Sequence, residues 1–158
     1  MANTQAMCTS FMGELMTATH NFGTAPTRGT SATDTFKAAL YLTSATYDAA
    51  TTAYSATGEV SGTNYTAGGV TVTAATPPTA TNSSATAGVA FFTPSASITY
   101  TTVTLSTAFD TVLLYNSTQS NKAVSVHTFG SQTITAGTFT LTMPTNNTST
   151  ALLRLATT

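Results

Sequence analysis

Threonine is the most frequent residue in this chain, and its placement limits the possible folds more than any other feature. Of the 158 residues, 41 are threonine. After Pro26, threonines alternate with larger apolar residues, as in the stretches 70–73 and 138–143. Alternation with a period of two places apolar side chains on one face of a β-strand, and threonine is β-branched and favours extended backbone. The pattern therefore predicts a mainly β fold in which threonine faces solvent.

We expect a single domain over residues 1–158, in which residues 34–156 form an antiparallel β-sandwich, jelly-roll-like, or a barrel. The stretch 74–88 is of low complexity and is expected to be an exposed loop. Elsewhere, apolar or β-branched runs are separated by Gly, Pro, Ser and Asn, which is typical of short strands joined by turns. The strand candidates are 36–43, 70–73, 89–93, 98–100, 103–105, 111–115, 122–129, 139–143 and 151–155.

Three of these candidates have further consequences. The apolar alternation changes phase between Ile98 and Tyr100 on one side and Val103 and Leu105 on the other. A shift of one residue moves every side chain to the opposite face, so a bulge or bend is expected between them. The uniformly apolar run 111–115 is typical of a strand that is covered on both faces.

The N-terminal stretch 4–22 differs from the rest, because its apolar residues recur every three to four positions. This spacing predicts a helix with a broad apolar stripe along one side. The stripe could pack on the chain's own sandwich or on another chain, and the sequence leaves both readings open. If it docks on another chain, the candidate partner-contact residues are Met7, Phe11, Met12, Leu15 and Met16.

Charged residues are rare: four Lys or Arg and five Asp or Glu give a net charge of −1, and only 6% of the chain is charged. Roughly 25% is usual for soluble domains. Binding of nucleic acid requires clustered cations, and a membrane-surface helix requires a basic face. We therefore expect no nucleic acid and no membrane as partner. The first residues carry no basic region and precede no long apolar run, so we expect no classical secretion.

The two histidines, His20 and His127, do not occur at metal-ligand spacing. His20 stands near the end of the predicted helix, where a protonated imidazole interacts well with the helix dipole. His127 falls opposite the apolar face set by Val124 and Val126, so it is expected to be exposed or interfacial. Cys8, the single cysteine, is expected to be a buried and inert thiol.

The sequence offers little for catalysis. The five carboxylates lie far apart, and Ser61 stands one place late for the nucleophile motif G-x-S-x-G. Asp110 and His127 could complete a triad with some serine, but any of 15 serines would serve that argument equally. We therefore expect no enzyme, with no catalytic residues, no cofactor and no metal.

The scarcity of charge also bears on assembly. Strand edges in natural proteins are commonly protected by lysine, proline or bulges, and such charged protection is almost absent here. An uncharged, threonine-rich β-protein is therefore expected to be part of a larger assembly that covers its edges. The alternative is a separate sandwich whose edges are covered by its own chain.

Three groups of segments carry a resemblance to known proteins. They are AMCTSFMGELM (6–16) with HNF (20–22), TFKAALY (35–41) with GEVSGTNYTAGG (58–69), and AFDTVLLYN (108–116) with AVSVHTFG (123–130). In this order they resemble a family of small virion structural proteins of tailed bacteriophages. The likeness covers nearly the whole chain and is weakest over 74–88. At Met12 the family pattern has a polar residue, often lysine, so the apolar stripe is wider here.

The resemblance implies a structural part of the phage head or head–tail region, most often a capsid decoration (cement) protein, and it supplies no catalytic residues. It implies the major capsid protein or other virion subunits as partners, a homo-oligomer (trimer or dimer), and a place on the phage head surface after synthesis in the host cytoplasm. One alternative is a neck or tail subunit, such as an adaptor, tube or fibre-associated protein. A weaker alternative is a carbohydrate-binding sandwich, since Trp is absent and the tyrosines are dispersed along the sequence.

Overall fold

The computed structural model describes residues 3–16, 19–22, 34–73, 78–81 and 88–156. These residues form eight strands in two antiparallel sheets and one short helix. Within these ranges neither sheet closes into a barrel, so the fold is mainly β and sandwich-like, as the threonine alternation predicts. The elements are β1 (Ala6–Met7), α1 (Thr9–Met16), β2 (Phe36–Leu42), β3 (Val70–Val72), β4 (Thr79–Thr81), β5 (Val89–Phe92), β6 (Ile98–Asn116), β7 (Lys122–Leu141) and β8 (Leu153–Ala156).

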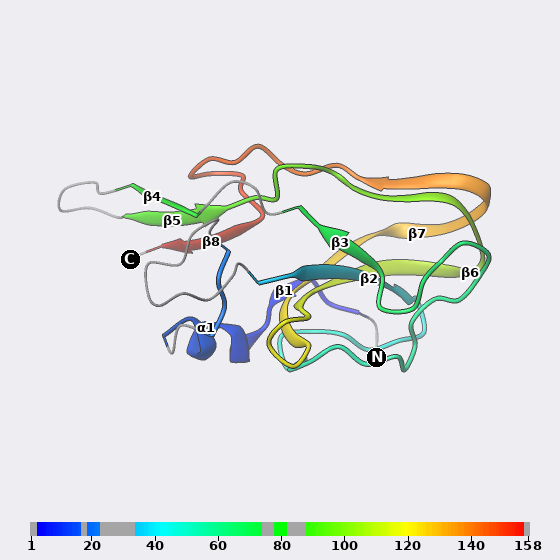
Figure 1. Ribbon diagram of the computed structural model, residues 1–158, viewed down its shortest axis with the longest axis horizontal. Coiled ribbons are helices and arrows are strands. Elements are labelled where there is room, and N and C mark those ends of the chain that lie inside the picture. The colour runs from blue at the N-terminus through cyan, green and yellow to red at the C-terminus, as the bar shows by residue number, and fades with distance from the viewer. Residues whose placement is uncertain (1–2, 17–18, 23–33, 74–77, 82–87, 157–158) are drawn as a thin grey trace.

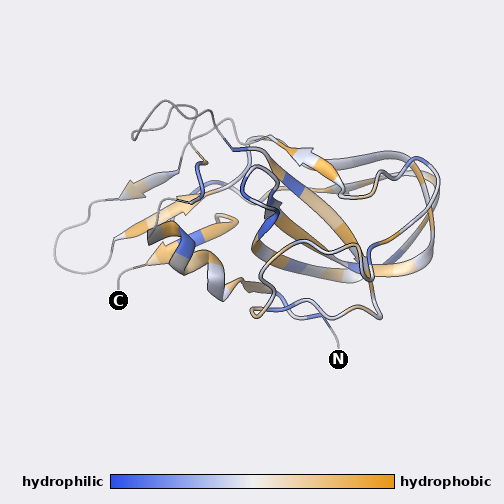
Figure 2. Cartoon of the chain, turned by 60° about the horizontal axis from the view of Figure 1, so that its bottom comes forward, coloured by the Kyte–Doolittle hydropathy of each residue, from blue (hydrophilic) through white to orange (hydrophobic). Residues whose placement is uncertain are grey.

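The larger sheet has the order β1-β7-β6-β2-β3, which places β6 at its centre. Leu113 on β6 lies opposite Ala39 on β2 and Val126 on β7. Every residue of the stretch 111–115 is buried. The uniformly apolar run is therefore covered on both faces, as predicted, and Figure 2 shows hydrophobic residues along these inner strands.

Strands β6 and β7 form a single long hairpin of 19 and 20 residues that folds back over the larger sheet (Figure 1). The predicted phase change appears as a register shift between Tyr100 and Val103, where Thr102 adopts a positive φ of 50°. Further shifts follow along the hairpin. Bulges bend and twist strands, and here they let the far end of the hairpin form a second layer. Runs that the sequence predicts as separate strands are thus parts of two continuous ones.

The smaller sheet has the order β4-β5-β8 and extends from one end of the molecule (Figure 1). The expectation of an exposed loop over 74–88 needs correction. Residues 79–81 form strand β4 and pair with β5, although all three are exposed as expected. Residues 74–77 and 82–87 lie outside the described residues.

The helix is much shorter than the expected span 4–22. It covers only Thr9–Met16, because the residues before it find hydrogen-bond partners in neighbouring strands and loops. Ala6 and Met7 pair with β7, and the Cys8 amide donates to the Val124 carbonyl. Backbone groups satisfied in this way cannot also close helical turns.

The segment 43–69 contains no regular strand but crosses the outer face of the larger sheet. It runs beside β7 at Ala53, which bridges to Lys122, and beside β2 at Val60, whose amide donates to the Leu40 carbonyl. Between these points Tyr54 stacks on Tyr115 of β6 at a centroid distance of 4.8 Å. This segment therefore covers one face of the sheet, and the folded hairpin covers the other.

Candidate functional site

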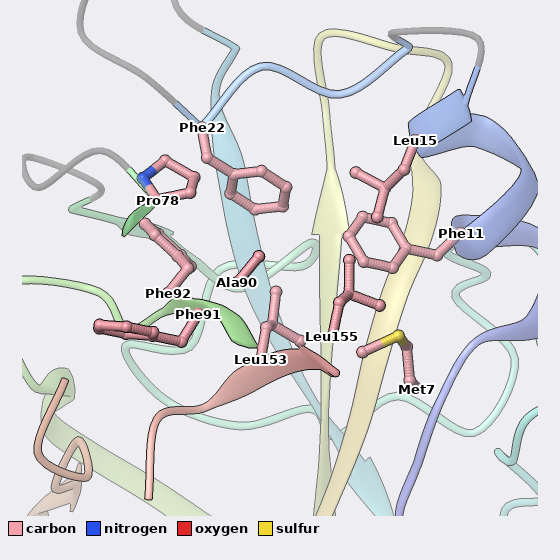
Figure 3. Close-up of a pocket in the computed structure, with 10 residues that line it drawn as sticks. All are labelled: Met7, Phe11, Leu15, Phe22, Pro78, Ala90, Phe91, Phe92, Leu153 and Leu155. Atoms are coloured by element: carbon pink, nitrogen blue, oxygen red, sulfur yellow. The ribbon is translucent and has the colours of Figure 1, made fainter. Parts of the chain in front are cut away.

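An apolar groove lies between the N-terminal elements and the smaller sheet (Figure 3). Side chains from β1 and α1 form one wall, and side chains from β5 and β8 form the other. The groove has a volume of about 70 Å³ and is open to solvent. The ten residues that line it are all apolar: Met7, Phe11, Leu15, Phe22, Pro78, Ala90, Phe91, Phe92, Leu153 and Leu155.

Three of the five candidate partner-contact residues line this groove. Met7 and Leu15 are half-buried, whereas Phe11 is only 2% exposed and forms part of the core. Met12 lies on the helix surface outside the groove lining and is 47% exposed. The side chain of Met16 lies outside the described residues. The helical stripe is thus divided between packing within the chain and an open surface.

The wall that contains α1 is held in place by a cluster of aromatic rings. Phe11 contacts the His20 ring edge-on at a centroid distance of 4.9 Å. Phe22 stacks on Phe36 of β2 at 4.2 Å and contacts Phe92 of β5 at 4.8 Å. Pairs of this geometry stabilise a fold beyond the area that they bury. The cluster therefore joins the helix, the larger sheet and the smaller sheet at the base of the groove.

A second anchor, which we call the ionic cluster, consists of Glu14, His20, Asp34, Asn116 and Lys122. The two Glu14 carboxylate oxygens accept from His20 Nε2 at 2.7 Å and from Lys122 Nζ at 2.6 Å. Asn116 Nδ2 donates to His20 Nδ1 at 3.1 Å and to Asp34 Oδ2 at 2.7 Å. Because an amide nitrogen only donates, the His20 proton lies on Nε2.

The ionic cluster corrects the expected role of His20. The imidazole lies outside the helix, which ends at Met16, and it links Glu14 to the β6–β7 turn. Burial raises the pKa of Glu14, but the hydrogen bonds from Lys122 and His20 outweigh it, so this pKa lies below its ordinary value. No spacing in the sequence indicates this cluster, because its members come from four separate stretches.

All six tyrosines come together around the segment 43–69, although they are dispersed along the sequence. Their rings contact one another in three pairs: Tyr54 stacks on Tyr115, Tyr65 stacks on Tyr100, and Tyr41 contacts Tyr47 at a tilt of 37°. We call these six residues together with Glu59 the tyrosine cluster.

Glu59 is the charged member of the tyrosine cluster. Its carboxylate accepts hydrogen bonds from Tyr54 Oη, Tyr65 Oη and the Gly68 amide, each at 2.7 Å. Other hydroxyls of the cluster cap backbone carbonyls, as Tyr41 does at Ser55 and Tyr115 at Gly68. The phenols thereby satisfy the backbone of an irregular segment.

The residues considered for catalysis do not assemble. Asp110 Oδ1 accepts from Asn3 Nδ2 and from Thr111 Oγ1, and His127 takes part in neither hydrogen bond. His127 Nε2 lies 2.9 Å from Ser125 Oγ, but Ser125 is only 1% exposed. Cys8 is buried, as expected, and burial raises the pKa of its thiol to about 11.

The expected exposure of His127 needs correction. Its side chain does point away from Val126, but the face it points to is the interior between the two layers, where it is partly buried. The alternation assigns the face correctly, yet both faces of this part of β7 are covered.

The described ranges also bear on metal binding and on membrane spanning. Within them, no group of three or more His, Cys, Asp or Glu residues is arranged to hold a metal ion. No helix formed by these residues is both long and apolar enough to cross a membrane.

Comparisons with protein-family models, with curated proteins and with solved structures each found no match to this chain.

Proposed function

We propose that this chain is a structural subunit of a tailed-phage virion, a capsid decoration protein that binds the assembled head shell through its apolar groove. The observation that carries the proposal is the groove itself, an entirely apolar and solvent-open surface on a chain with very few charges. Leu155 on its β8 wall is 41% exposed. The resemblance of the three groups of segments to small phage virion proteins supports the same conclusion.

The chemistry of the groove defines the segment of the shell that it fits. With no charged or polar lining residue, the groove favours an uncharged, apolar segment of the major capsid protein, since an unpaired charge there would lose its hydration. β8 is an edge strand of the smaller sheet, so its outer backbone groups are available to pair with such a segment. A specific interface of this kind buries roughly 1,600 Å² in total.

Binding to the assembled shell but not to separate subunits would stabilise the shell by linkage. Many copies on a symmetric shell multiply the effect of modest contacts. A dimer or trimer of this chain at a local symmetry axis of the shell is the simplest arrangement.

The test compares two aspartate variants on the same strand. Leu155→Asp places a charge in the groove, whereas the exposed neighbour Ala156 points to the opposite face of β8, so Ala156→Asp is the matched control. We expect Leu155→Asp to remain folded and to lose at least tenfold in affinity for assembled shells, and Ala156→Asp to bind normally. Shell binding by Leu155→Asp at the unaltered affinity would contradict the proposal.

The number of copies in purified particles separates the shell from other positions. Hundreds of copies per particle are expected for a decoration protein. Six or twelve copies would indicate the neck or tail instead, and absence from particles together with binding on a glycan array would favour the carbohydrate-binding alternative.

A further inference from the structure

A second hollow lies between the two layers of the sandwich and shares no lining residue with the groove. Its walls come from β2, from both ends of β6, from β7 and from residues 142–152. The cavity has a volume of about 130 Å³. The cavity is partly open to solvent, and because protein interiors are packed about as densely as organic crystals, a hollow of this size in a small sandwich is a distinct feature.

The cavity exists because β2 carries a small residue at its centre and cannot move to fill the space. Ala38 lines the cavity between the bulky, buried Phe36 and Leu40. The Ala38 carbonyl accepts a hydrogen bond from Tyr100 Oη at 2.8 Å. Gly69, at a φ of 72°, approaches the same carbonyl so closely that a Cβ would collide with it. Contacts on both sides therefore fix the backbone of Ala38.

One polar ring reaches this largely aliphatic space. His127 lines the cavity, and among the described residues Ser125 Oγ is the hydrogen-bond partner of its ring, through Nε2. No charged side chain lines the cavity. Burial lowers the pKa of His127 to about 4, so the ring is neutral near pH 7 and has one N–H donor and one acceptor. The second ring nitrogen can thus bind a polar group of a ligand.

We propose that this cavity binds a small uncharged molecule consisting of a single six-membered ring with one hydroxyl group, which forms a hydrogen bond with His127. A dry cavity of about 150 Å³ holds benzene in another protein, so the volume fits one ring. An ionised ligand is disfavoured, because its charge would be buried without a partner. The hydroxyl group matches the His127 ring, and the other polar side chains of the wall are those of Thr128 and Thr142.

The test uses phenol and toluene, which have nearly the same size and differ in the hydroxyl group. We expect both to raise the Tm of the wild-type chain in a concentration-dependent way and to shift the methyl resonances of Val112, Leu141 and Leu152. Phenol should bind about fivefold more tightly than toluene, as one net hydrogen bond predicts. In His127→Phe this preference should disappear, whereas toluene should still bind.

Ala38→Val fills the cavity with two further carbon atoms. We expect this variant to lose the response to both probes, whereas Thr71→Val, which adds a valine on the exposed face of β3, should keep it. Cavity methyl resonances that do not respond to saturating probe in the wild-type chain would overturn the proposal, and this measurement needs no variant to fold. Shifts confined to the groove residues Leu15 and Leu155 would overturn it as well. Either result leaves the proposal of shell binding intact, because that rests on the groove.

Discussion

The ionic cluster and the tyrosine cluster perform the same task with different chemistry. Each fastens an irregular stretch of chain to the larger sheet: the ionic cluster holds the stretch after α1, and the tyrosine cluster holds the segment 43–69. The first concentrates three of the nine charged residues around a buried histidine and asparagine. The second uses six neutral phenols and a single carboxylate.

The comparison shows how a chain with few charges can satisfy buried polar groups. Phenol hydroxyls donate to carbonyls without bringing a charge into the interior, so burial costs less than for an ion pair. The difference also predicts opposite limits of stability: the tyrosine cluster should fail in alkali and the ionic cluster in acid.

The largest expected effect is alkaline unfolding. Burial, and for Tyr54 and Tyr65 also hydrogen bonding to Glu59, raises the pKa of Tyr41, Tyr54, Tyr65 and Tyr100. Because these pKa values are higher in the folded state, the stabilisation is complete below about pH 10 and is lost above it, by about 1.4 kcal/mol per pH unit for each such tyrosine.

We therefore expect cooperative unfolding between about pH 10 and pH 12, measured by circular dichroism, with tyrosinate absorbance rising in the same transition. Gradual ionisation of the tyrosines near pH 10 in a chain that keeps its circular dichroism signal would show that the cluster is not tightly buried.

Removing the carboxylate tests the tyrosine cluster directly. Glu59→Ala leaves the hydroxyls of Tyr54 and Tyr65 and the Gly68 amide without their acceptor. We expect a loss of about 3 kcal/mol in the free energy of unfolding, measured by urea denaturation at pH 7. Glu59→Gln keeps one acceptor oxygen and should lose about half as much. Equal stability of Glu59→Ala and the wild-type chain would mean that water replaces the carboxylate at no cost.

The matching change in the ionic cluster should have a smaller effect. In Asp34→Asn one carboxylate oxygen becomes an amide nitrogen, which cannot accept. Either the bonds that Asn116 Nδ2 and the Asn21 amide donate to one oxygen are lost, or the bond from Gln119 Nε2 to the other oxygen is lost. We expect a loss of about 2 kcal/mol in the same urea experiment. Asp48→Asn is the control, because asparagine can still accept from the Ala50 amide, and its stability should change by less than about 0.5 kcal/mol. An equal loss in both variants would show that the position of Asp34 in the cluster is unimportant.

The smallest expected effect is a loss of stability in acid, to which His127 and Glu14 contribute over different pH ranges. The pKa of His127 is lowered by burial to about 4, so its stabilising contribution is complete above pH 6.5 and is lost as the pH falls toward 4. The pKa of Glu14 lies below its ordinary value of 4.5, so its contribution is lost only below that pH.

His127→Phe should therefore reduce the loss of stability between pH 7 and pH 5 by on the order of 1 kcal/mol and leave the loss below pH 4.5 in place. Thermal unfolding at a series of pH values measures both. An unchanged profile between pH 7 and pH 5 would place the His127 ring in contact with solvent.

Several features of the fold were predictable from local patterns. The alternation of threonine with apolar residues predicted the β class, and its change of phase predicted the bulge after Tyr100. The uniformly apolar run 111–115 predicted a strand covered on both faces. The burial of Cys8 was predicted correctly but from the apolar side of a helix, whereas Cys8 precedes α1 and is held beside β7. Where a neighbouring strand competed for the backbone, local periodicity was insufficient. The stretch 4–8 has helical spacing but is held by hydrogen bonds to β7 and to the segment 43–69.

A β-rich, nearly uncharged chain with an apolar N-terminal stripe can be predicted from residue type and spacing alone. The use of that stripe depends on long-range packing, which places Phe11 in the core and Met7 and Leu15 on an open groove. The same long-range packing places six dispersed tyrosines around Glu59 and places His127 in the wall of a cavity. Such contacts join residues that are far apart along the chain. Which of these residues meet depends on how the long hairpin folds back, and no local sequence pattern encodes that fold.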